Sequence, residues 1–106
     1  MSAESARSMT FQATPSDVYA ALLEAARRAG FQLLSGDVST GTAMFTSGRF
    51  LLAVGEKVNA RWSEVGPGTV QVTMSTAKFG IAGSGRRARG VDRLSDELSG
   101  LLPRAQ

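Results

Sequence analysis

The sequence predicts an α+β domain in which a single antiparallel sheet of about five strands packs against two helices, in the order β-α-β-β-β-β-α. Two segments repeat apolar residues every three or four positions, which is typical of amphipathic helices. Five shorter segments alternate apolar and polar residues, which is typical of half-buried strands. Such a sheet needs a cover for its apolar face, and two amphipathic helices can supply it.

The first strand is expected over residues 7–13, and a helix follows it. Thr14 can accept a hydrogen bond from the amide of Asp17, and Pro15 suits the first helical position. The left-handed conformation that glycine readily adopts predicts that the helix ends at Gly30. The apolar stripe of this helix is Val18, Leu22, Ala25 and Ala29, widened by Tyr19, Leu23 and Ala26.

Four strands are then expected, separated by turns. They cover residues 31–35, residues 42–47, a long strand from Phe50 to Trp62 that is bent or bulged at Gly55, and residues 69–77. We expect turns over residues 36–41 and 66–68, because both segments are rich in glycine.

The glycine-rich segment 80–85 predicts a connection to a second helix, from about Arg86 to Leu101, which Pro103 ends. The apolar stripe of this helix consists of Val91, Leu94, Leu98 and Leu101.

Length and composition predict a small single domain over residues 1–106, with residues 1–6 disordered and residues 7–103 folded. Of the 106 residues, 42% are hydrophobic and 20% are charged. No apolar run approaches the roughly 18 residues of a membrane span, and the first residues lack the apolar stretch of a secretory signal. We therefore expect a cytoplasmic protein, either a monomer or a homodimer.

The chain contains no cysteine and no histidine. These absences exclude a thiolate nucleophile, an imidazole base and the usual nitrogen and sulfur ligands of metals. Serine and threonine are numerous, but no residue stands out as the base that would activate one of them. We expect no enzymatic activity, no metal and no cofactor.

The formal net charge of +3 is concentrated in one segment. Residues 78–93 hold five cations and one acid, and the rest of the chain holds seven cations and eight acids. Such a local excess of positive charge favours a single anionic contact over a broad basic surface. The candidate anion-binding residues are Ser84, Gly85, Arg86, Arg87, Arg89 and Arg93.

Two interpretations of this segment remain open. Arginines on one helix face can grip a phosphate or carboxylate with paired hydrogen bonds, and backbone amides at a helix start attract anions. Alternatively, the arginines form a solvated face, paired with Asp96 and Glu97, and the glycines form a flexible crossover. Weak nucleic-acid binding through the arginine cluster is a third alternative, which the sequence favours less, because the aromatic residues that would stack on bases are not interleaved with the cations.

Two functional hypotheses follow. The first is that a small anionic and apolar ligand, such as a fatty acid, binds between the sheet and the C-terminal helix. The groove would be lined by Phe45, Val54, Val58, Trp62, Val72, Met74, Leu94 and Leu98. The second is a fully packed protein-interaction or dimerisation module that uses an edge strand, the outer sheet face or the arginine helix.

The order of elements resembles that of the halves of TATA-binding protein and, with more strands, that of helix-grip ligand-binding domains. The chain also resembles short bacterial domains of unknown function, and its Ala, Gly and Arg content is typical of GC-rich bacterial genomes. The matching pieces are Thr14 to Tyr19, Gly30-Phe31, Gly66 to Val70, and Gly83 to Leu102. The resemblance implies a fold and no activity.

Overall fold

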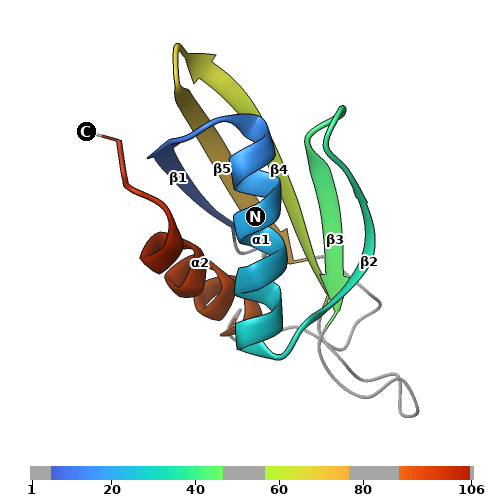
Figure 1. Cartoon of the computed structure of the whole chain (residues 1–106). Coiled ribbons are helices and arrows are strands. Elements are labelled where there is room, and N and C mark those ends of the chain that lie inside the picture. Colours follow the sequence, from blue (N-terminus) through green and yellow to red (C-terminus); the bar gives the residue numbers. More distant parts are fainter. Residues whose placement is uncertain (1–5, 47–56, 77–88, 106) are drawn as a thin grey trace, which may run out of the picture.

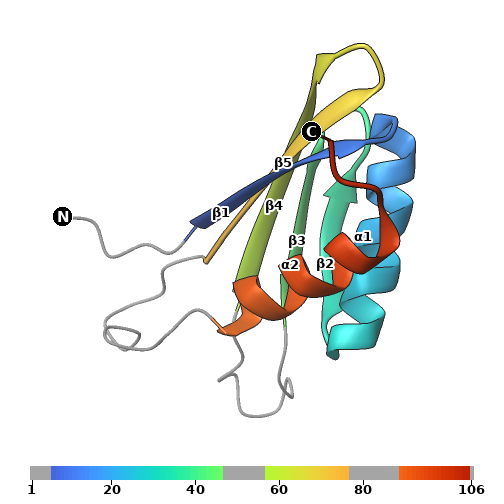
Figure 2. The same cartoon turned by 90° about the vertical axis from the view of Figure 1, so that its left-hand side faces the viewer.

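The computed structural model describes residues 6–46, 57–76 and 89–105. These residues form one five-stranded antiparallel sheet with two helices on one face, so the predicted α+β class and the order β-α-β-β-β-β-α are confirmed (Figure 1; Figure 2). The elements are β1 (Ala6–Gln12), α1 (Pro15–Ala29), β2 (Gln32–Asp37), β3 (Thr42–Thr46), β4 (Lys57–Gly66), β5 (Thr69–Thr76) and α2 (Arg89–Leu101).

Helix α1 begins and ends as its sequence predicts. The side chain of Thr14 accepts a hydrogen bond of 3.1 Å from the backbone amide of Asp17, and Pro15 occupies the first turn. Gly30 has a φ of 84° and ends the helix. The amide of Phe31 then donates to the carbonyl of Ala26 at 2.7 Å, which turns the chain sharply into β2.

The strand order in the sheet is β1-β5-β4-β3-β2. Strands β2 to β5 follow one another as a meander, and β1 pairs with the far side of β5. Alternation along the strands directs apolar side chains toward the helices and polar side chains outward. The inward-facing residues that form the core include Met9, Phe11, Ala43, Phe45, Val58, Ala60, Trp62, Val70, Val72 and Met74.

Strand β2 is longer than predicted, because Gly36 and Asp37 belong to it and not to the following turn. Gly36 pairs with Ala43 and Asp37 pairs with Thr42, so pairing with β3 extends β2 beyond the point where its local sequence stops favouring a strand. The turn is confined to residues 38–41, and Gly41 adopts a φ of 71°.

The predicted strand from Phe50, its bend at Gly55, the connection 80–85 and the start of the second helix at residues 86–88 lie outside the described residues. Within the described ranges, β4 begins at Lys57 and α2 at Arg89. The inward phase predicted for Val58, Ala60 and Trp62 is confirmed, since all three are buried.

Helix α2 and the tail that follows it hold one side of the molecule together. Arg7 on β1 lies 3.2 Å from Asp92 and 3.8 Å from Asp96 on α2. After α2, the carbonyl of Pro103 accepts from the amide of Gln12 at 2.8 Å. The amide of Ala105 donates to the carbonyl of Thr10 at 2.9 Å. The C-terminal tail therefore pairs with the outer edge of β1.

Neither helix in the described ranges has the length and apolar content that a membrane crossing requires.

Candidate functional site

The described residues of the predicted sheet–helix groove are packed into the core. Each is at most 4% exposed, and all belong to a single cluster of buried apolar side chains. These residues are Phe45, Val58, Trp62, Val72, Met74, Leu94 and Leu98. Val54, the remaining groove residue, lies outside the described residues. In the part of the chain that can be described, these groove residues pack against one another.

Only Arg89 and Arg93 of the predicted anion-binding cluster belong to the described residues. Ser84, Gly85, Arg86 and Arg87 lie outside the described residues, and Arg89 is the first residue of α2. The one side chain of the cluster that is described, that of Arg93, is exposed. Asp92 and Asp96, which are close to it in sequence, pair with Arg7 on β1.

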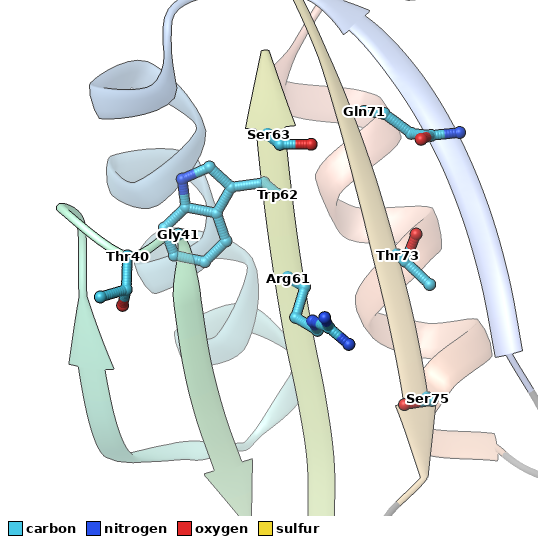
Figure 3. Close-up of a pocket in the computed structure, with 8 residues that line it drawn as sticks. All are labelled: Thr40, Gly41, Arg61, Trp62, Ser63, Gln71, Thr73 and Ser75. Carbon is cyan, nitrogen blue, oxygen red and sulfur yellow. The ribbon is translucent and has the colours of Figure 1, made fainter. Parts of the chain in front are cut away.

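An open hollow of about 420 Å³ lies against the outer face of the sheet (Figure 3). Arg61 and Ser63 enter it from β4, and the β2–β3 turn borders it at one end. Its lining is completed by Thr40, Gly41, Trp62, Gln71, Thr73 and Ser75.

The chemistry of this hollow is that of a solvated sheet face. The lining residues have hydroxyl and amide groups around one cation, Arg61, which is exposed to solvent. A single exposed guanidinium contributes little to the binding of an anion, because water screens its charge. No group of three or more potential metal-ligating side chains occurs in residues 6–46, 57–76 and 89–105.

The largest departure from ordinary burial is at the edge of the sheet formed by β2. Every residue of β2 is exposed, although its sequence contains two adjacent leucines. Leu33 is 41% exposed, Leu34 is 48% exposed, and Val38 in the next turn is 42% exposed. A bulge between Leu33 and Ser35 makes Leu34 an extra residue in this strand.

Helix α1 adds a fourth apolar side chain to this edge. Tyr19 lies over Gly36, since a Cβ added to Gly36 would collide with the Tyr19 ring. Leu23 follows Tyr19 by one helical turn on the same side of α1, and it is 37% exposed. We call Leu23, Leu33, Leu34 and Val38 the apolar edge. The prediction that Leu23 widens the buried stripe of α1 is correct only in part.

A rigid substructure supports the apolar edge from within. The ring of Trp62 stacks on that of Tyr19, with centroids 5.6 Å apart and planes inclined by 22°. The Trp62 amide donates to the carbonyl of Gly41 at 2.8 Å. Because a Cβ at Gly41 would collide with the Trp62 carbonyl, this position requires glycine for its space as well as for its φ. The turn that carries Val38 is therefore firmly attached to β4.

Charged groups lie at both ends of the apolar edge. On α1, Glu24 accepts hydrogen bonds from Arg27 at 2.7 Å and from Arg28 at 2.9 Å, and these bonds lower the pKa of Glu24 to about 2. At the far end of β2, Asp37 accepts from the hydroxyl of Ser39 at 2.7 Å and from its amide at 2.9 Å. These bonds lower the pKa of Asp37, so the carboxylate stays charged at neutral pH.

The apolar edge was not predicted from the sequence, although one signal was present. Two adjacent leucines in a strand cannot both face inward under period-two alternation, so Leu33-Leu34 indicated an apolar side chain without a place in the core. No protein-family model matches this chain, and no curated protein matches it either.

Proposed function

We propose that this chain is a non-catalytic protein-interaction module that binds its partner through the apolar edge. The observation that carries the proposal is the distribution of exposed apolar side chains. Of the five large apolar residues that are exposed in the described ranges, four form the apolar edge, and only Val65 lies elsewhere, on the β4–β5 hairpin. Single exposed apolar residues are common on protein surfaces, whereas several at one edge of a sheet are typical of an interaction site.

The backbone at the same place supports this function. β2 is the last strand of the sheet, so one side of it has no neighbouring strand in the described residues. An edge strand has backbone N–H and C=O groups that point outward and can pair with another chain. The apolar side chains beside them add the energy of burying apolar surface, about 25 cal/mol for each Å² removed from water.

The packing of the interior also favours a protein-interaction function over a ligand site between the sheet and α2. Seven of the eight residues predicted to line that site pack together in the core. A protein with a filled core has its outer surface available for binding, and the apolar edge is where that surface departs most from a solvated one.

Photo-crosslinking in living cells tests the proposal. A photoreactive amino acid placed at Val38 is expected to give a discrete crosslinked protein band, because Val38 is exposed at the apolar edge. The matched control has the same amino acid at Val65, which is exposed on the distant hairpin, and it is expected to give no band.

The double variant L33Q/L34Q with the photoreactive group at Val38 completes the design. The band is expected to disappear, because glutamine at these two positions removes the apolar contacts of β2 with little change of volume. The proposal is wrong if position 38 gives no discrete band in the unsubstituted chain, or if the band persists in the double variant.

A further inference from the structure

We infer that the partner bound at the apolar edge is a second copy of this chain, joined by antiparallel pairing of β2 with β2. This inference rests on the proposed function and identifies its partner. Such a pairing has a two-fold axis, so each copy presents the same surface to the other. It would join two five-stranded sheets into one and place the two α1 helices side by side on the same face.

The exposed apolar residues of β2 lie close to that two-fold axis. The axis of an antiparallel β2 pair passes near the middle of the strand, between Leu34 and Ser35. Leu34 is then opposite Ser35 of the second copy and Leu33 is opposite Gly36, so the exposed leucines of the two copies lie diagonally across the axis from one another.

The position of Leu23 supports the same axis. Tyr19 lies over Gly36, which is one and a half residues beyond the middle of β2. At about 3.3 Å per strand residue this offset is roughly 5 Å, which is the rise of three to four residues in a helix. Since α1 and β2 run in opposite directions, the middle of β2 is level with Leu23. The exposed leucines of both elements are thus level with the axis.

The charged residues beside the apolar edge also favour antiparallel pairing. Asp37 lies two and a half residues from the middle of β2, or roughly 8 Å on one side of the axis. Arg27 lies four residues beyond Leu23, or roughly 6 Å on the other side. Antiparallel pairing would therefore bring the acidic end of one copy level with the basic end of the other. A parallel pair would place like charges together, which is unfavourable.

The bulge at Leu34 acts against unlimited pairing. A bulge shortens the regular ladder that an edge strand offers to a neighbour. Apolar contacts of Leu23, Leu33 and Leu34 must therefore supply part of the stability, and the dimer is expected to dissociate on dilution. At the opposite edge of the sheet the chain's own tail already pairs with Thr10 and Gln12, which leaves only part of β1 for another strand, so we expect pairing to stop at two copies.

Analytical ultracentrifugation of the full chain over a range of concentrations measures the dimer. We expect reversible dimerisation, weakened by about thirtyfold or more in L33Q/L34Q, because both copies lose two apolar contacts. The control V65Q is expected to dimerise like the unsubstituted chain. Circular dichroism and thermal unfolding at a dilution where all variants are monomeric would verify that the double variant is folded.

The absence of cysteine in the chain permits an unambiguous test of geometry. The variant Leu34→Cys is expected to give a covalent dimer with a short thiol crosslinker, and the variant Val65→Cys is expected to give no covalent dimer. A spin label at Leu23 is expected to report a short distance between copies. A long distance at position 23 together with a dimer would overturn the β2 pairing.

The two proposals can fail separately. If the chain is monomeric at all concentrations, and Val38 crosslinks to a different protein, the protein-interaction function stands and the second copy is wrong. If the chain is monomeric and Val38 crosslinks to nothing, both are wrong. If Val38 crosslinks to a second copy and L33Q/L34Q abolishes that product, both are supported.

Discussion

The two edges of the sheet are treated differently by the same chain. At the β1 edge, residues 103–105 fold back and pair with Thr10 and Gln12. Arg104 also lies over the ring of Phe11, with its guanidinium carbon 5.9 Å from the ring centroid. At the β2 edge, no described segment covers the strand, and apolar side chains are exposed.

This difference shows that exposure at β2 is not a general property of a small sheet. Proteins commonly protect edge strands with a covering segment, with charges or with proline. The chain has a covering segment at β1, whereas β2 contains neither lysine nor proline and has only a bulge and the carboxylate of Asp37 at its end. The tail pairs with the β1 edge, whereas the β2 edge is apolar and less protected. This difference supports the proposal that the β2 edge binds a partner.

The largest expected effect is a difference in the free energy of unfolding between a substitution in β1 and one in β2. Replacing Phe11 with alanine is expected to lower the free energy of unfolding by about 3–5 kcal/mol, because Phe11 is fully buried beneath the tail. Replacing Leu34 with glutamine is expected to change it by about 0.5 kcal/mol or less, since Leu34 is about half exposed. Urea unfolding followed by fluorescence measures both, because the single Trp62 is buried in the folded state.

Both variants should be compared at a concentration where the chain is monomeric, so that dimer dissociation does not contribute. A loss of several kcal/mol in the monomeric Leu34→Gln variant would show that β2 is part of the core, and the contrast between the edges would be lost.

A smaller effect is expected when the cover of β1 is removed. A chain that ends at Leu102 loses two backbone hydrogen bonds to β1 and is expected to be about 1–3 kcal/mol less stable. Hydrogen exchange measures the local effect, since the amide of Gln12 loses its acceptor, the carbonyl of Pro103.

The variant Arg104→Gln is the matched control for this truncation. It keeps the backbone pairing and removes the contact with Phe11, which is worth about 0.5–1 kcal/mol at an exposed site, together with the hydrogen bond of 3.3 Å that Arg104 donates to the Ser99 hydroxyl. Unchanged protection of the Gln12 amide in the truncated chain would show that the tail does not cover this edge.

The smallest effect concerns the charges beside the apolar edge. The pKa of Glu24 is about 2 in the folded chain, below its ordinary value of 4.5, because Arg27 and Arg28 bind the carboxylate. A lowered pKa stabilises the fold above pH 4.5, and this contribution disappears as the pH falls through about 2. Glu24→Gln is therefore expected to flatten the dependence of stability on pH over this interval.

Chemical unfolding at a series of pH values measures this slope. A residual slope is expected in the variant, because the pKa of Asp37 is also lowered by its bonds from Ser39. Glu64→Gln, on the distant β4–β5 hairpin, is the matched control. An unchanged slope in Glu24→Gln would show that the contacts of Glu24 with the arginines do not persist in solution.

Local patterns were sufficient to predict most elements of the fold. The cap at Thr14, the glycine at position 30 and the alternation of Val70, Val72 and Met74 each act over a few residues, and the structure has the predicted helix and strand at these places. The end of β2 was predicted two residues too early, because Gly36 and Asp37 join the strand through pairing with β3.

The candidate site could not be predicted from local sequence patterns. All but one of the predicted groove residues are buried in the core, and most of the arginine cluster lies outside the described residues. The exposure of the apolar edge depends on which strand stands last in the sheet. That order joins segments far apart in the sequence, and periodicity carries no information about it.

The sequence by itself determined the identity of the elements and the face that each one buries, because helix and strand periods are local properties of the backbone. The tertiary structure alone decided that β1 would pair with β5, that the tail would pair with the end of β1 and that β2 would have no further strand beside it in the described residues. These outcomes depend on contacts between distant residues, such as Arg7 with Asp92 and Gln12 with Pro103. Such contacts stabilise the fold only after the chain has closed the loop between the two residues, which local sequence patterns do not specify.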